Sequence, residues 1–91
     1  MKSGLNGAAR HHYAEEHQVD LCWRMRAPTG HLLTCGLYRT ADGLELRAGY
    51  PGDDPMWAEA VLSEEAAVII AAAWKEVVTS KGGFVDLDPA H

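Results

Sequence analysis

Two cysteines are the most reactive side chains of this 91-residue chain, and their spacing suggests a relation between them. Cys22 and Cys35 lie on either side of the turn-like segment Ala27–Gly30. If a hairpin turns there, the two cysteines face each other on neighbouring strands, with Cβ atoms about 4.5–5.5 Å apart. The pair therefore predicts either two reduced thiols or a regulatory or structural disulfide. It does not predict a metal site, because the CxxC spacing is absent.

Arginine is the second residue type with a chemical role to assign. Half of the eight basic residues are expected on one face of the sheet that this hairpin begins, namely Arg24, Arg26, Arg39 and Arg47. Leu33 and Leu37 are expected to point outward between them, and an apolar centre with an arginine rim is typical of protein interfaces. Glu45 is expected opposite Arg39, and such a cross-strand pair would explain two charges without a function. The face is thus either solvated and self-paired, or a binding surface.

Histidines near the N-terminus have the donor atoms of a metal site, but no well-defined ligand spacing. They are His11, His12 and His17, near Glu15 and Glu16. If this segment is helical, His12 and Glu16 share a face, which would allow weak transition-metal binding. We expect a solvated tail instead, with no metal and no cofactor. The chain also lacks a nucleophile elbow, a phosphate-cradling loop and an HExxH motif, so no enzyme is predicted.

The elements that would position these residues begin with a strand over 19–26, in which apolar and polar residues alternate. Pro28 and Gly30 suit a type I turn at 27–30. A three-residue loop ending at Gly43 then keeps the third strand in phase with the first. The predicted inner face comprises Val19, Leu21, Trp23, Met25, Leu32, Thr34, Gly36, Tyr38, Leu44, Leu46, Ala48 and Tyr50.

A helix is predicted from Ser63, its N-cap, to about Thr79, with Lys81-Gly82-Gly83 ending it. Asp54-Pro55 suggests a short helical turn before it. Gly36 and Ala48, neighbours on the inner face, would let an alanine-rich helix approach closely. The core-facing stripe of the helix is predicted to be Ala66, Ile69, Ile70, Ala73, Trp74 and Val77.

The fold class is therefore α+β: a three-stranded antiparallel β-meander with one C-terminal helix packed on one face, in the order β-β-β-α. We expect a loosely ordered N-terminal tail over 1–17, a single domain over 18–87 and a C-terminal tail over 88–91. The longest apolar run, 66–74, is too short for a bilayer that needs about 20 residues. With no apparent signal peptide and two cysteines, a cytoplasmic protein with reduced thiols is expected.

The order β-β-β-α, with Ser63-Glu64-Glu65-Ala66-Ala67 opening the helix, resembles in topology plant AP2-type and integrase arm-binding DNA modules. That resemblance implies DNA binding through arginines of the exposed sheet face. The YRG and WLG elements of those modules are absent, and a net charge of −5 disfavours phosphate binding.

The function predicted first is a non-catalytic interaction module, a homo-oligomer or the partner of another protein, using the exposed sheet face or the helix exterior. Val68 and Ala72 are expected on that exterior. The alternative is nucleic-acid binding through the arginines, and a third hypothesis is a redox switch at Cys22 and Cys35.

Overall fold

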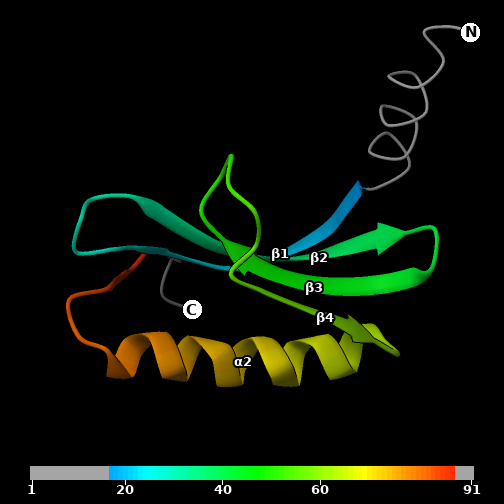
Figure 1. Ribbon diagram of the computed structural model, residues 1–91. Helices are drawn as coiled ribbons and strands as arrows, with labels where there is room; N and C mark the ends of the chain where they lie inside the picture. The colour runs from blue at the N-terminus through cyan, green and yellow to red at the C-terminus, as the bar shows by residue number, and fades with distance from the viewer. Residues whose placement is uncertain (1–16, 88–91) are drawn as a thin grey trace, which may run out of the picture.

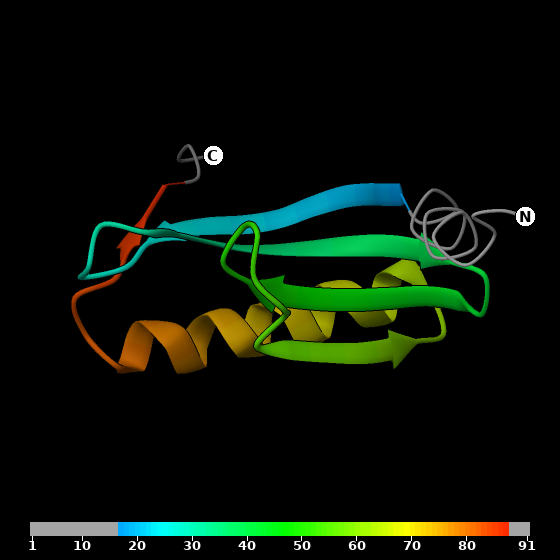
Figure 2. The ribbon, with the colours of Figure 1, turned by 45° about the horizontal axis from the view of Figure 1, so that its top comes forward.

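The computed structural model describes residues 17–87, which form one antiparallel sheet and one helix (Figure 1). The elements follow in the order β1 (His17–Arg26), β2 (Leu32–Thr40), β3 (Gly43–Gly49), β4 (Trp57–Val61), α2 (Glu64–Ser80) and β5 (Val85–Asp86). The strand order across the sheet is β4-β3-β2-β1-β5. The helix lies along one face, and the loop between β3 and β4 rises from the other (Figures 1 and 2). The tails 1–16 and 88–91 lie outside the described residues.

The sheet has five strands, so the α+β class is confirmed but the predicted count of three is wrong. The fourth strand occupies Trp57–Val61, which follows the segment where Asp54-Pro55 suggested a helical turn. Residues 57–61 are Trp-Ala-Glu-Ala-Val, and only Leu62 separates them from the Ser63 N-cap. A helix that short is marginal, whereas a strand gains the whole edge of β3 as a partner.

The first turn contains one residue more than the sequence predicts. The Ala27 N–H donates to the carbonyl of His31, 2.8 Å away, and Gly30 adopts a φ of +93°. This glycine in the left-handed region lengthens the loop, as in a G1 bulge, and shifts the pairing of β1 with β2 by one position. Because the side-chain period of a strand is two, the shift moves every side chain of β2 to the other face.

The central strand is therefore reversed relative to the prediction. The helix side of β2 carries Leu33, Cys35 and Leu37, which are 0%, 0% and 2% exposed. Leu32, Thr34, Gly36 and Tyr38, predicted to be inner residues, lie on the outer face. The sequence did indicate which face of β2 is buried. Positions 33, 35 and 37 hold Leu, Cys and Leu, which are more apolar than the Thr, Gly and Tyr at positions 34, 36 and 38.

The third strand nevertheless faces the predicted way. Thr40 pairs with Gly43, so the loop between β2 and β3 has two residues instead of the three expected. The second loop is one residue shorter than predicted and the first turn one residue longer, so the two shifts in register cancel at β3. Leu46 and Ala48 consequently lie on the Trp23 side, at 0% and 1% exposure.

Two β-bulges interrupt β1, between Gln18 and Asp20 and between Leu21 and Trp23. A bulge opposes two residues to one on the partner strand, and it breaks strict alternation of the side chains. As a result Val19 and Leu21, predicted to lie in the core, are 40% and 43% exposed.

The predicted ends of the helix are confirmed. Ser63 accepts a hydrogen bond from the Ala66 N–H at 3.1 Å, and Glu64 and Glu65 occupy the positive end of the helix dipole. At the other end Gly82 and Gly83 both have positive φ angles, which lets the chain turn back towards the sheet.

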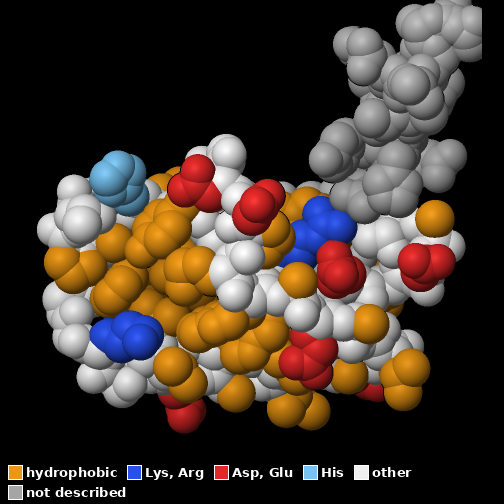
Figure 3. All heavy atoms as spheres, in the orientation of Figure 1, with side chains coloured by type: hydrophobic (Ala, Val, Ile, Leu, Met, Phe, Trp, Pro, Cys, Tyr) orange, Lys and Arg blue, Asp and Glu red, His pale blue; other side chains and the backbone are white. Residues whose placement is uncertain are grey.

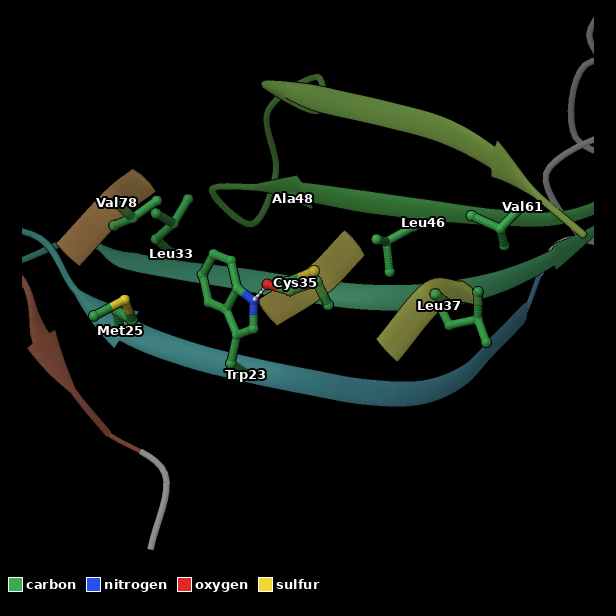
Figure 4. Close-up of a cluster of buried hydrophobic side chains, with 11 residues drawn as sticks. Trp23, Met25, Leu33, Cys35, Leu37, Leu46, Ala48, Val61 and Val78 are labelled. Atoms are coloured by element: carbon green, nitrogen blue, oxygen red, sulfur yellow. Dashed lines mark hydrogen bonds between the residues drawn. The ribbon is translucent and has the colours of Figure 1, made fainter. Parts of the chain in front are cut away.

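The face that the helix buries is rotated from the one predicted: Ile70 and Trp74 pack against the core as expected, but Ile69, Ala73 and Val77 do not. Ala67, Ala71 and Val78 are 1%, 3% and 1% exposed, whereas Ile69 and Val77 are 71% and 47% exposed. The reason lies in the sheet, whose inner layer is filled by large side chains, namely Trp23, Met25, Leu33, Leu37 and Leu46 (Figure 4). Large groups on the sheet leave room only for the small alanine face of the helix.

Trp23 joins the two layers. Its indole N–H donates to the carbonyl of Ala71, 2.8 Å away, in the middle of the core (Figure 4). Gly36, expected beside Ala48 under the helix, instead lies on the outer face, where the Tyr38 ring covers it. Within residues 17–87, no helix is long and apolar enough to span a membrane.

Candidate interaction surfaces

The outer face of the sheet collects three of the four predicted arginines. Arg24 pairs with Thr34, Arg26 with Leu32 and Arg47 with Gly36, and all these partners face away from α2. Arg39 is the exception, because it pairs with Leu44 on the helix side. No helix or strand of residues 17–87 covers the outer face (Figure 2).

The predicted apolar centre of that face does not exist, because Leu33 and Leu37 belong to the core. Tyr38 takes its place. The Arg47 guanidinium lies 4.7 Å from the centroid of the Tyr38 ring, and its Nε is 2.6 Å from Glu45 Oε1. Glu45 is thus paired with Arg47 on its own strand, and its predicted position opposite Arg39 is wrong. These contacts partly neutralise the cationic patch.

A hollow surrounds the loop between β3 and β4, a feature that the sequence did not suggest. Its larger part has a volume of about 500 Å³ and is lined by Thr29, His31, Leu32, Tyr50, Pro51 and Asp53. A smaller part of about 210 Å³ lies on the other side of the loop, beside Tyr38 and Arg47. The His31 ring meets the Tyr50 ring edge-on, with centroids 6.3 Å apart, and Thr29 Oγ1 lies 2.9 Å from His31 Nδ1. The lining mixes aromatic, proline and a few polar side chains, and it indicates no particular reaction.

The helix exterior carries large apolar side chains that the core does not bury, such as Ile69 and Val77. Trp74 packs against Trp57 of β4 with ring centroids 5.4 Å apart, while Lys75 forms an ion pair with Asp86 of β5 at 2.7 Å. Because successive helical residues are rotated by about 100°, these two contacts define which flank of α2 faces each edge of the sheet. The flank on the β4 side, which we call the apolar stripe, consists of Ala66, Ile69, Ala73 and Val77, and the half-buried Ile70 borders it where it packs against the core.

Glu64 and Lys75 lie on the far side of the helix from the apolar stripe. Glu65 and Glu76 border the stripe, since they lie four residues before and seven residues after Ile69. Viewed from the β4 side, hydrophobic side chains cover a broad area of the surface and continue along the helix (Figure 3). Val68 and Ala72 are exposed as predicted, but on the other flank, next to Lys75 and Glu76.

The two thiols are neighbours, although the predicted register is off by one. Trp23, not Cys22, is the direct partner of Cys35, and the bulge between Leu21 and Trp23 places Cys22 beside it. Cys22 is half-buried and packs against the core, while Cys35 is fully buried, and both are free thiols. A hydrogen bond from the Cys35 thiol lowers the pKa of Cys22. The same bond, together with burial, raises the pKa of Cys35.

The described residues contain no group of three side chains able to hold a metal ion. Of the histidine cluster only His17 is described, and it begins β1. His11, His12, Glu15 and Glu16 lie outside the described residues. No protein-family model, curated protein or solved structure matches this chain.

Proposed function

We propose that this chain is a non-catalytic interaction module that pairs with a second copy of itself through the apolar stripe of α2. The observation that carries the proposal is the orientation of the helix, which buries alanines and leaves Ile69 and Val77 at 71% and 47% exposure. Contiguous apolar patches on a small protein mark interaction sites more often than single exposed residues do.

The stripe is self-complementary. In a two-fold dimer with antiparallel helices and Ala73 nearest the axis, Ile69 of one copy meets the region of Val77 of the other, since each lies four residues from Ala73. Ala66 and Ala73 allow close approach of the two backbones. Burying Ile69 and Val77 in both copies removes four branched side chains from water, each worth about 1.5–3 kcal/mol when fully buried.

Charge favours the same orientation. An antiparallel pair places the acidic first turn of one helix, Glu64 and Glu65, at the end where Lys81 follows the other. A 17-residue helix is about 25 Å long, so a seam along it is long enough to hold all members of the stripe. Because association itself costs about 4–15 kcal/mol, we expect a dimer of modest affinity.

Light scattering coupled to size exclusion, over a series of chain concentrations, tests this pairing. Wild type is expected to convert from monomer to dimer as concentration rises, and Ile69→Glu to remain monomeric because it buries a charge in the seam. Val68→Glu is the matched control: it introduces the same charge at a 63% exposed position of the same helix, on the other flank. A wild-type monomer at every concentration, or equal loss of dimer in both variants, would contradict the proposal.

A second candidate function is nucleic-acid binding through the outer face, where Arg24, Arg26 and Arg47 lie on one side of the sheet. We expect Arg26→Ala, an exposed outer-face change, to weaken such binding, and added salt to weaken it further. Arg39→Ala is the control, because Arg39 lies on the helix side. An electrophoretic mobility shift assay at low salt, with duplex and single-stranded probes, tests this function. If the protein shifts none of the probes, nucleic-acid binding is excluded.

A further inference from the structure

The core contains a pair of thiols that no part of the proposed dimer uses. Cys22 and Trp23 occupy the two positions of a β-bulge opposite Cys35, so both side chains are directed to the helix side of the sheet. The two cysteines are therefore neighbours across the β1–β2 pair. They differ in access, since Cys22 is half-buried and Cys35 is 0% exposed.

We propose that Cys22 and Cys35 form a reversible dithiol–disulfide pair, in which Cys22 reacts with a hydroperoxide and Cys35 resolves the product. The geometry assigns these roles. Only Cys22 can meet a solvent-borne oxidant while the domain stays folded, and Cys35 is its neighbour on the adjacent strand. A disulfide needs an S–S distance of about 2.03–2.05 Å, which requires the two sulfurs to approach each other by side-chain rotation.

The chemistry proceeds in two balanced steps. The Cys22 thiolate attacks one oxygen of hydrogen peroxide, the O–O bond breaks, and after uptake of a proton the products are a sulfenic acid on Cys22 and one water. The Cys35 sulfur then attacks the Cys22 sulfur, forming the S–S bond and releasing the hydroxyl with the Cys35 proton as a second water. Two thiols thus lose two electrons and one peroxide is reduced; a dithiol reductant reverses the change.

The hydrogen bond between the thiols supports this order of events. Because the Cys35 S–H donates to Cys22, the pKa of Cys22 is lowered, which increases the thiolate fraction of the more accessible sulfur. The pKa of Cys35 is raised by the same bond and by burial, which keeps it a thiol until Cys22 is oxidised.

The test treats the full chain, folded, with an equimolar amount of hydrogen peroxide. The intact mass should fall by two hydrogen atoms, the titratable thiols of the denatured protein should disappear, and dithiothreitol should restore both. Peptide mapping should locate one intramolecular Cys22–Cys35 bridge. Tryptophan emission should also fall, because the new disulfide lies beside Trp23 and disulfides quench nearby indoles.

Two variants separate the roles, with circular dichroism as the check that each is folded. Cys35→Ala should accumulate a sulfenic acid on Cys22 that dimedone traps, and Cys22→Ala should leave Cys35 unmodified. Two thiols that stay free in the wild type, a bridge only between different chains, or equally fast oxidation of Cys35 in Cys22→Ala would each overturn the proposal. Mapping of the wild type alone is decisive if either variant fails to fold.

Discussion

Leu33→Ala is expected to lower the free energy of unfolding by about 2–5 kcal/mol, whereas Leu32→Ala should lower it by less than about 1 kcal/mol. The two residues are neighbours of the same type, but Leu33 is 0% and Leu32 37% exposed. Removing the Leu33 side chain leaves a cavity between β2 and α2, while Leu32 lies on the outer face. The free energy of unfolding of a small domain is only about 5–15 kcal/mol, so Leu33→Ala would remove a large part of it.

Urea unfolding, followed by far-ultraviolet circular dichroism, measures both variants. The chain concentration must be the same throughout, because self-association adds to apparent stability. The pair tests the register of β2 directly. Equal costs at the two positions, or a larger cost at Leu32, would mean that the other face of β2 packs against the helix.

Trp23→Ala is expected to cost about 3–5 kcal/mol and to leave the domain close to unfolding. The indole is 2% exposed and fills the space between β1 and α2. Trp23→Phe keeps most of the apolar volume but loses the bond from the indole N–H to the Ala71 carbonyl, which contributes about 0.5–1.5 kcal/mol net.

Urea unfolding of the wild type and both Trp23 variants separates the contribution of the buried ring from that of the indole hydrogen bond. Trp57→Phe is the control, because Trp57 is half-buried on the edge strand β4, where its ring packs against the Trp74 ring. If Trp23→Ala costs no more than Trp57→Phe, Trp23 is not the residue that holds the two layers together.

The sequence predicted correctly those helix and strand positions that depend on residues close together in the chain. The helix begins after Ser63 and ends before two glycines because caps act within one turn of the backbone. The alternation through Trp23 and Met25, and through Leu46 and Ala48, placed these residues on the core side correctly. The strand at 57–61 was not predicted because its residues do not alternate between apolar and polar, and because the Asp-Pro pair before it is also a good helix start.

The candidate sites depend on which residues share a face of the sheet. Strand register decides this, and the sequence predicted it less accurately. One additional loop residue, at Gly30, turned Leu33 and Leu37 from a proposed binding surface into core. The pairing of β1 with β2 is shifted by one residue from the prediction, so Trp23 is opposite Cys35. A bulge in β1 nevertheless places Cys22 beside Cys35. The three arginines that share the outer face do so in either register, because two of them lie on β1 and one on β3.

From the sequence alone follow the α+β class, the helix with both its ends, and the faces of β1 near Trp23 and of β3. Those depend on interactions between residues close in the chain. The face of β2, the bulge beside Cys22 and the rotation of α2 were decided only by tertiary structure. Register depends on how many residues a turn contains, and helix rotation on which volumes the sheet leaves free. Large side chains on the sheet required small ones on the helix, so Ile69 and Val77 were left at the surface.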